Sequence, residues 1–396
     1  MKVLVLSHMY PNSMNPVYGI FVHEQVKALK NLGHDVNVIS PVPWAPFPIN
    51  IINKKWNQYS NINKYEQIEG IDVYHPRKIT LPRKILYDKS GKFYYKAIKN
   101  ITNKIHQNFK FDIIHSHVSL PDGIAGSYLS DLFKVPSITT IHGQDLQQTI
   151  NINKKCYDKI GLSFKKNDAI IFVSEKLKDI AIEEFPRFSD KYHIISNGLN
   201  LDKIFTINSR LKKQYKNKTV LLSVSNLKKT KGIDLNLKAV NKVTEKKENI
   251  YYIIVGDGTQ KENLKSLAKE LGIEENVEFT GRLPHDKVME YMSICDVFSL
   301  PSWQEGFGIV YIEAMAHEKP VIACKGEGID GIIKNGENGI LVSPKSVNDL
   351  SKAIFHLLNN DNLRKEISKK AQKTAKEYTW ENNAINTMKL YKKLLK

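Results

Sequence analysis

The chain has 396 residues, of which 41% are hydrophobic and 25% are charged, so it has the length for two domains, or three, and the composition of a globular protein. This composition excludes a disordered chain, a collagen and a coiled coil. The net charge of +18 would attract an anionic partner, but only six of the 59 basic residues are arginine. Because arginine makes the bidentate contacts that read bases, we expect no nucleic-acid partner.

Short apolar runs, each followed by a helical pattern, recur in the first half of the chain. They predict buried parallel strands at Lys2–Leu6, Asp35–Ile39, Ile113–His115, Ser137–Ile141 and Ala169–Val173. Between the first two runs, the apolar residues of Val22–Leu32 repeat with helical spacing, which predicts a crossover helix. Alternation of strands and helices is typical of an α/β fold.

The same alternation begins again in the second half, after the polar, lysine-rich stretch Asn200–Lys218. Strands are predicted at Thr219–Val224, Tyr251–Val255, Val277–Thr280, Val297–Leu300 and Pro320–Ala323, and helices at Asp234–Val243, Gln260–Leu271 and Asp361–Lys396. We therefore expect two Rossmann-like, doubly wound domains that face each other across a cleft.

Several features of the sequence limit its chemistry. The glycine fingerprint of dinucleotide-binding proteins is absent, since Gly19 is the only glycine after the first strand and Gly256–Gly258 lacks a third glycine, so hydride transfer is not expected. The cysteines are far apart and form no CxxC pair, which predicts neither disulfides nor a zinc site: Cys156, Cys295 and Cys324. No apolar run approaches the roughly 18 residues of a membrane span. We expect a cytoplasmic protein.

The segment Leu300–His317 carries the clearest chemical signal. A predicted strand ends at Leu300, and two glycines frame the predicted start of a helix, where free N–H groups suit a phosphate. Glu305 precedes that helix and Glu313 lies within it, eight positions later, or about 12 Å along a helix axis. A glycosidase pair flanks one bond at about 5–9.5 Å, so the two glutamates suit the two ends of an elongated ligand better.

Seven motifs together give the chain a resemblance to a known family. In chain order they are Tyr18–Gln25, Thr140–Asp145, Ile195–Asn200, Leu222–Asp234, Val255–Gly258, Phe279–Leu283 and Leu300–His317. They resemble the retaining, family-4-type glycosyltransferases with the GT-B fold, and the pattern looks like bacterial transferases of capsule, teichuronic-acid and lipopolysaccharide synthesis. The resemblance implies an acceptor-binding domain of residues 1–200 with 380–396, and a nucleotide-sugar-binding domain of residues 201–379.

The resemblance also implies roles for side chains of the second domain. Glu305 and Glu313 match the EX7E motif, so that Glu313 would hold the ribose hydroxyls and Glu305 the transferred sugar. Lys231 would hold the donor diphosphate, and a flexible ammonium suits a leaving group that gains negative charge. Asn226 stands where the family usually has an arginine, so one of the two lysines after it would have to supply that charge.

Further positions complete the site that the resemblance implies. Backbone N–H groups for the donor would come from the start of the EX7E helix, at Phe307, Gly308 and Ile309. Arg282 suits the base edge of the nucleotide, although an ordinary surface arginine would give the same pattern. In the first domain, His142 would lie near the sugar ring and the reactive centre, and Gly19 would let the first loop approach the phosphates.

The expected activity is that of a retaining, metal-independent hexosyltransferase without a further cofactor. Its donor would be a nucleotide sugar, most often UDP-linked in similar proteins, and the leaving phosphate would act as the base. Its acceptor would be a sugar, lipid-linked in cell-surface polysaccharide biosynthesis, or else a soluble small molecule. Two alternatives stay open: a sugar-nucleotide epimerase of the same fold, and a non-catalytic protein that binds membranes or polyanions on a transferase scaffold.

The basic residues cluster in residues 74–110, which hold ten lysines and arginines and one acidic residue. Residues 90–108 predict a helix whose apolar stripe faces the core and whose lysines are solvated. The preceding loop alternates basic and apolar side chains, as membrane-surface segments do, with the basic ones at Arg77, Lys78, Arg83 and Lys84. Either this is an ordinary solvated surface or, as we hypothesise, it docks on the anionic inner face of the plasma membrane.

Three remaining polar residues receive structural interpretations. His115 and His117 flank the end of a predicted strand, and we expect one to face the cleft and the other the core. Asp122 stands in a Pro-Asp-Gly sequence, which predicts a turn residue.

Overall fold

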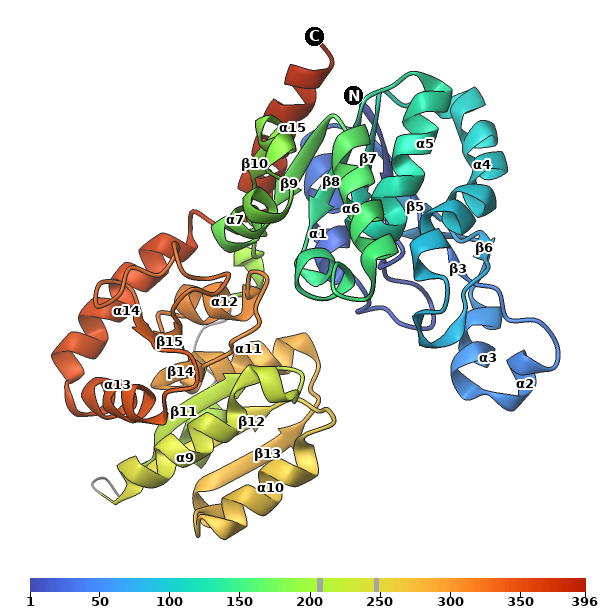
Figure 1. Cartoon of the computed structure of the whole chain (residues 1–396). Coiled ribbons are helices and arrows are strands. Elements are labelled where there is room, and N and C mark those ends of the chain that lie inside the picture. Colours follow the sequence, from blue (N-terminus) through green and yellow to red (C-terminus); the bar gives the residue numbers. More distant parts are fainter. Residues whose placement is uncertain (205–208, 246–248) are drawn as a thin grey trace. The chain divides into compact units, whose positions relative to one another are not determined.

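The computed structural model describes residues 1–204, 209–245 and 249–396. They form two compact units (Figure 1). The N-terminal unit comprises Met1–Asn197 together with Trp380–Lys396, and the C-terminal unit comprises Gly198–Thr379. Each unit has its own sheet and its own core, and each is described by itself.

The N-terminal unit is built on an eight-stranded sheet with the order β10-β9-β8-β7-β1-β2-β5-β4. Its strands are β1 (Lys2–Leu6), β2 (Asp35–Ile39), β4 (Tyr65–Ile68), β5 (Ile71–Tyr74), β7 (Ile113–His117), β8 (Ser137–Ile141), β9 (Ala169–Phe172) and β10 (Tyr192–Ile194). All neighbours are parallel except β4, which is antiparallel to β5. The edge strands β4 and β10, and β5 beside β4, were not predicted from the sequence because they are short and partly exposed, and so form no continuous apolar run.

Helices flank this sheet, and two short strands, β3 (Val42–Pro43) and β6 (Arg77–Lys78), pair outside it. The helices are α1 (Ile20–Asn31), α2 (Ile49–Ile52), α3 (Lys54–Asn61), α4 (Ser90–Phe109), α5 (Ile124–Phe133), α6 (Lys154–Lys166), α7 (Glu175–Glu184) and α15 (Trp380–Leu394). Helix α15 packs on α1, where the Gln25 amide donates a hydrogen bond to Asn383 Oδ1 at 2.6 Å. The C-terminal end of the chain therefore completes the N-terminal unit.

The C-terminal unit has a six-stranded parallel sheet with the order β13-β12-β11-β14-β15-β16. Its strands are β11 (Thr219–Val224), β12 (Ile250–Val255), β13 (Val277–Gly281), β14 (Val297–Leu300), β15 (Val321–Cys324) and β16 (Ile340–Val342). Its helices are α8 (Ser209–Gln214), α9 (Ile233–Thr244), α10 (Lys261–Glu270), α11 (His285–Ile294), α12 (Ile309–Ala316), α13 (Val347–Asn359) and α14 (Asp361–Ala375). The predicted α/β architecture with two Rossmann-like sheets is confirmed.

The tail Asp361–Lys396 is helical, as predicted. The segment forms two helices, α14 and α15, because the chain leaves the C-terminal unit between them. At this point the Tyr378 carbonyl accepts a hydrogen bond from the Leu199 N–H at 3.0 Å, so both chain crossings between the units lie side by side.

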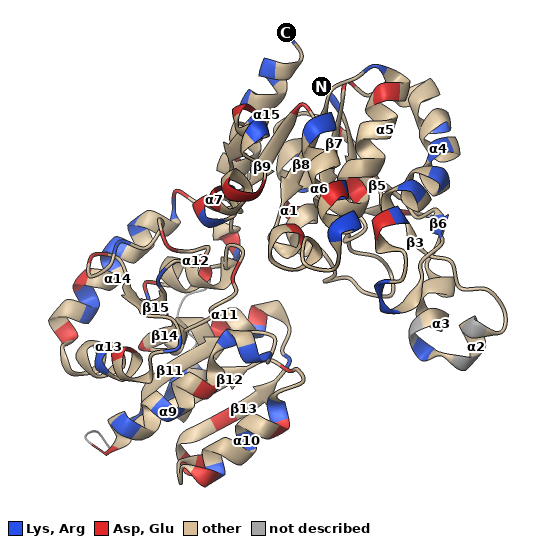
Figure 2. Cartoon of the chain, in the orientation of Figure 1, with Lys and Arg blue, Asp and Glu red and all other residues tan. Residues whose placement is uncertain are grey.

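Helix α4 shows how the basic segment is divided between core and solvent. Tyr94, Ile98 and Ile105 are buried in the core of the N-terminal unit, as the apolar stripe predicts. The lysines of the helix are exposed: Lys92, Lys96, Lys99 and Lys104. Figure 2 shows basic residues along α4 in blue. No helix in the described part of the chain combines the length and apolar character needed to cross a membrane.

Candidate active site

Each sheet has one position where the order of strand addition reverses, here called its switch point. In the C-terminal unit, β12 and β13 lie on one side of β11, whereas β14, β15 and β16 lie on the other. In the N-terminal unit the reversal falls between β1 and β7. Open α/β folds bind ligands outside the carboxyl ends of the strands at such a position. Residues in the loops after β11 and β14 are therefore the first candidates.

These two loops bring two of the predicted residues together. The Nζ of Lys231, after β11, lies 2.6 Å from Oε2 of Glu305, after β14. Both side chains are largely buried, with exposed fractions of 19% and 15%. A charge-assisted hydrogen bond in such partial burial is stronger than one at a free surface. The sequence predicted that both residues touch one donor, and the C-terminal unit holds them in direct contact with each other.

Gly232 explains why the two loops can approach so closely. It has a φ of 69° and directly precedes α9, and a Cβ at this position would collide with the carbonyl oxygen of Pro301. Only glycine combines this left-handed conformation with the absence of a side chain. The loop after β11 thus lies directly against the loop after β14, and this contact places Lys231 beside Glu305.

A buried carboxylate that the sequence analysis missed holds the second loop in place. The backbone N–H of Glu305 donates a hydrogen bond to Oε2 of Glu327 at 2.7 Å, and Glu327 is only 7% exposed. A Cβ on the neighbouring Gly328 would collide with the carbonyl of Gly306, so this segment too approaches backbone to backbone. The Gly-Glu-Gly sequence was the available signal, because glycines on both sides of an acid indicate a crowded turn.

The start of α12 provides the predicted backbone groups. Gly308 has a φ of 90° and directly precedes the helix, whose first residue is Ile309, and Phe307 is buried. The first turn of a helix leaves N–H groups without partners inside the helix, and its dipole favours an anion. The three residues predicted to face the donor therefore lie at a helix terminus beside Glu305.

Glu313 has a partner that the sequence analysis also missed. Its Oε1 lies 2.8 Å from Nε2 of His285, the first residue of α11. The Glu313 carboxylate raises the pKa of the His285 imidazole above its ordinary value, because it stabilises the protonated ring. Glu313 is only 13% exposed, whereas His285 is 49% exposed, so the imidazole covers the carboxylate from the solvent side.

Two other predicted residues are solvent-exposed. Asn226 lies in the loop after β11 and Arg282 directly after β13, so both stand at the same carboxyl edge as Lys231. Lys228 and Lys229, which could replace the family's arginine, are exposed as well. Because they follow parallel strands of one sheet, all these side chains belong to one edge of the C-terminal unit.

In the N-terminal unit, His142 follows β8 and lies against the start of α1. Its ring packs on Phe21, with 4.6 Å between the ring centroids, and its Nε2 lies 3.0 Å from Nδ1 of His117. Burial lowers the pKa of His142 to about 3, so the ring is neutral at physiological pH. Gly19, with a φ of 67°, begins α1, and a Cβ there would collide with the carbonyl of Met9.

The expectation that His115 and His117 face opposite ways is wrong. Both belong to β7, both are buried, and their rings stack with 4.7 Å between the centroids. Residues i and i+2 of a strand point to the same face of the sheet. Because β7 continues through His117, the side chains of His115 and His117 lie on the same face. His115 is held by Tyr391 of α15 at 2.6 Å and by Thr140 at 2.7 Å.

Asp122 lies in the π-helical segment Ser119–Gly123 and not in the turn that its sequence context predicts. Its side chain is fully buried and bonds to His8. Tertiary packing places its carboxylate under the loop that follows β1.

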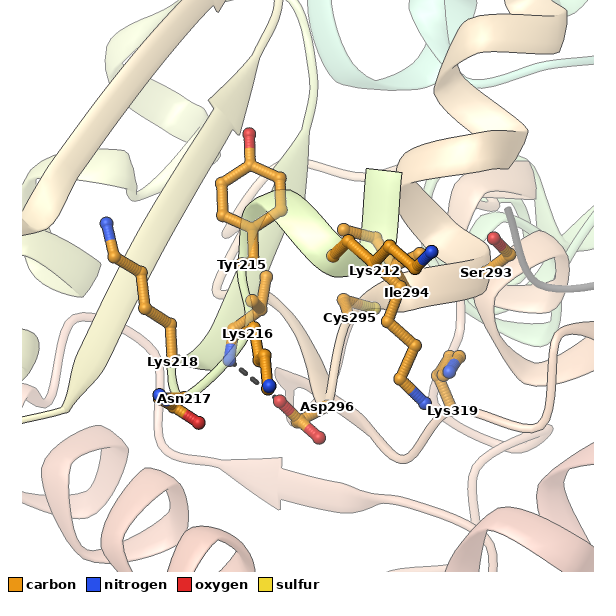
Figure 3. A pocket seen from close by; sticks show the side chains of 12 residues that line it. Lys212, Tyr215, Lys216, Asn217, Lys218, Ser293, Ile294, Cys295, Asp296 and Lys319 are labelled. Atoms are coloured by element: carbon orange, nitrogen blue, oxygen red, sulfur yellow. Dashed lines mark hydrogen bonds between the residues drawn. The ribbon is translucent and has the colours of Figure 1, made fainter. Parts of the chain in front are cut away.

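A separate cavity of the C-terminal unit lies away from the candidate site. It has a volume of about 530 Å³, and five of its twelve lining residues are lysines; Figure 3 shows the lining side chains, with Asp296 among them. Asp296 precedes β14 and accepts a hydrogen bond from the N–H of Val220 in β11, so this cavity lies at the amino ends of the strands. Within the described ranges, no group of three or more His, Cys, Asp or Glu side chains is arranged to hold a metal ion.

Comparison with known families covers almost the whole chain in two parts. Residues 19–203 match the family described as Glycosyltransferase Family 4, and residues 205–374 match the family described as Glycosyl transferases group 1. The first match lies mostly in the N-terminal unit and extends a few residues past its boundary. The second match lies in the C-terminal unit.

Individual relatives and solved structures agree with these matches. The chain is 27% identical to a putative teichuronic acid biosynthesis glycosyltransferase, TuaC, of Bacillus subtilis, over 89% of this chain and 88% of the relative. Its fold is similar to that of sucrose-phosphate synthase from Thermosynechococcus elongatus, with a TM-score of 0.80, 20% identity and coverage of 100% and 99% of the two chains. It is also similar to HepE of Anabaena in complex with UDP-glucose, with a TM-score of 0.76, 20% identity and full coverage of both chains.

Proposed function

The chain belongs to the family 4 glycosyltransferases and has their GT-B fold, and from this premise we propose that it is a retaining enzyme that transfers a hexose from a UDP-sugar. The Lys231–Glu305 pair at the switch point of the C-terminal unit is the observation that carries the proposal. It joins a cation suited to a diphosphate to a carboxylate suited to sugar hydroxyls, at the edge where such sheets bind ligands. The UDP-glucose complex of the structural relative HepE supports the choice of nucleotide.

The proposed donor site uses the groups at this edge in a definite order. Glu313 accepts hydrogen bonds from the ribose hydroxyls, and Arg282 lies at the base. Lys231 and the N–H groups at the start of α12 stabilise the diphosphate. Asn226 carries no charge, so the lysines that follow it stabilise the part of the diphosphate nearest to it. In this arrangement Lys231, rather than a metal ion, supplies the positive charge.

The proposed chemistry follows from where charge develops. The bond between the anomeric carbon and the phosphate oxygen breaks, and the acceptor oxygen bonds to the same carbon from the same face. The proton of the acceptor hydroxyl passes to the leaving phosphate, whose growing negative charge Lys231 stabilises. His142, neutral in its buried position, offers hydrogen bonds to the sugar ring without adding charge.

A donor panel tests this proposal. The protein is incubated with UDP-, GDP- and ADP-linked hexoses without an acceptor, and nucleotide binding, slow nucleotide release and the identity of the remaining sugar are measured. We expect UDP-sugars to bind and to release UDP slowly through hydrolysis. An epimerised sugar would overturn the transferase assignment in favour of the epimerase, and absence of all nucleotide binding would favour the non-catalytic alternative.

For the acceptor, we propose a lipid-linked sugar presented at the inner face of the plasma membrane, and the relative named for teichuronic acid biosynthesis supports a role in the cell envelope. Fewer of the basic residues are available for contact with a membrane than the sequence indicated. Arg77 points inward and donates hydrogen bonds to the carbonyls of Ser60 and Ile62, so it is not available to a membrane. Lys78 is held over the ring of Tyr94, with 5.1 Å between Nζ and the centroid.

The membrane-facing surface is therefore assigned to the loop before α4. Arg83 and Lys84 are exposed there beside exposed apolar side chains, Ile79, Leu81, Ile85 and Leu86. Co-sedimentation with anionic and neutral vesicles tests this, with the double variant Arg83→Gln/Lys84→Gln compared with Lys212→Gln/Lys213→Gln, which removes the same charge from the C-terminal unit. We expect only the first variant to lose binding to anionic vesicles. Equal losses in both would leave the loop as an ordinary solvated surface.

A further inference from the structure

The N-terminal unit has a polar pair of its own at its switch point. His8 follows β1 and Asp122 follows β7, and these two strands are neighbours in the sheet although the residues are 114 positions apart. Nδ1 of His8 lies 2.8 Å from Oδ2 of Asp122, and the backbone N–H of His8 donates to the same oxygen at 3.2 Å. The pair occupies the same topological position in this unit as Lys231 and Glu305 do in the other.

Burial determines how this pair must be hydrogen-bonded. The Asp122 side chain is 0% exposed, and a buried carboxylate is tolerated only when hydrogen bonds compensate its charge. The Nδ1–H of His8 provides such a bond, and in the tautomer that carries its proton on Nδ1 the other ring nitrogen, Nε2, accepts hydrogen bonds. A histidine held in this way selects a ligand that brings a hydrogen-bond donor, such as a hydroxyl group.

His8 also lines a cavity of about 440 Å³ within the N-terminal unit. The walls of this cavity are mixed: Tyr18, Lys78, Tyr87 and Ser90 provide polar groups, and Val42, Ile62, Leu81 and Phe93 are among its apolar residues. Burial lowers the pKa of Lys78 to about 8. A volume of this size with mostly apolar walls and a few polar groups is typical of a small-molecule site. It suits a sugar ring that carries an apolar substituent.

We propose that His8 is a catalytic residue that binds the acceptor, with its Nε2 accepting a hydrogen bond from an acceptor hydroxyl, and that Asp122 is the positioning residue that fixes the tautomer of His8. This inference rests on the proposed function, which supplies the reaction. His8 takes no proton in the transfer, since the proton of the attacking hydroxyl leaves with the diphosphate. Its contribution is to orient the acceptor, which lowers the entropy lost on reaching the transition state.

The probes for this proposal are octyl glycosides of glucose, galactose and N-acetylglucosamine, because they combine a sugar ring with an apolar chain. Two quantities are measured for each protein: UDP affinity by calorimetry, and the KM and kcat of glycoside-stimulated UDP release from the UDP-sugar that the donor panel identifies. The proposed function assigns the nucleotide to groups of the C-terminal unit, and His8 is not among them, so UDP affinity separates failure of this inference from failure of the proposed function.

The variants are chosen so that a merely structural role gives a different result. His8→Ala should raise the glycoside KM at least tenfold and leave UDP affinity unchanged. Asp122→Asn should have a similar effect, because an amide that donates to Nδ1 turns Nε2 into a donor, as in other histidine sites held by a carboxylate. His8→Gln, whose side-chain oxygen can still accept a hydrogen bond, should restore part of the affinity. His34→Ala removes a histidine of the same unit outside the cavity and serves as the control.

Each result has a definite meaning. A glycoside KM for His8→Ala within a factor of two of wild type would overturn the role of His8. Binding of UDP-sugar without stimulation by any of the glycosides would overturn the ligand class assigned to the cavity. Absence of UDP-sugar binding in the wild-type protein would instead refute the proposed function itself.

Discussion

The ammonium group of Lys231 lies 2.6 Å from the carboxylate of Glu305, across 74 residues of chain. Each charge is the counter-ion of the other in the protein without donor. In the proposed reaction the diphosphate competes with Glu305 for this ammonium group, so that Lys231 exchanges one anion for another as the donor binds. The ion pair thus keeps the ammonium group of Lys231 in a position from which it can contact a leaving group.

Replacing Lys231 with alanine should lower turnover by about 10²-fold or more, the scale of losing one fixed group that stabilises developing charge. The measurement is UDP release under saturating donor. Lys238→Ala, which removes an exposed lysine of α9 that has no assigned role at the donor site, is the matched control and should change turnover little. Turnover near the wild-type value for Lys231→Ala would refute the role given to this residue.

Glu305→Gln separates the two functions of the pair. The amide keeps the shape of the side chain but no longer competes for Lys231, so UDP should bind as tightly as in the wild type or more tightly. Turnover should nevertheless fall by about 10²-fold, because the carboxylate that faces the transferred sugar is lost. Calorimetry and steady-state rates on one preparation test both statements, and weakened UDP binding would contradict the proposed competition.

The His285–Glu313 contact predicts a pH dependence of donor binding. Glu313 raises the pKa of His285, so their ion pair is present below that pKa and is lost as the pH rises through it. Since the protonated imidazole competes with the ribose for Glu313, UDP affinity should fall as the pH is lowered through this pKa. Calorimetry over a pH series should show this dependence in the wild type and not in His285→Ala, whereas Glu313→Ala should weaken UDP binding at every pH.

The buried histidines predict a pH dependence of stability. Burial lowers the pKa of His115 to about 3, so the unfolded chain binds more protons than the folded one between that value and the ordinary pKa of histidine. The stability that His115 contributes is therefore present above its unfolded pKa and is lost as the pH falls towards its folded pKa. In His115→Gln, urea unfolding between about pH 4 and 6 should show a slope smaller by about one proton. An unchanged slope would contradict this assignment.

The central strands could be predicted from the sequence because parallel strands covered on both faces are continuous apolar runs. Five of them have the predicted bounds: β1, β2, β8, β11 and β14. The edge strand β4 could not be predicted from the sequence, because alternate residues face solvent and the local pattern resembles that of a loop. The glycines around Glu305 were informative for a related reason. A glycine between a strand and a helix indicates a crowded backbone even when the crowding partner is distant in sequence.

The sequence by itself determined the two-sheet α/β class, the family and the segments that carry the candidate residues, because these depend on local periodicity and on short motifs. Only the tertiary structure decided which charges meet. Lys231 reaches Glu305, and His8 reaches Asp122, because neighbouring parallel strands bring their carboxyl ends together at a switch point regardless of sequence separation. The direction of Arg77 was decided in the same way, since the carbonyls that bind its guanidinium belong to another segment. Pairing between distant loops depends on strand order, and strand order leaves no local trace in the sequence.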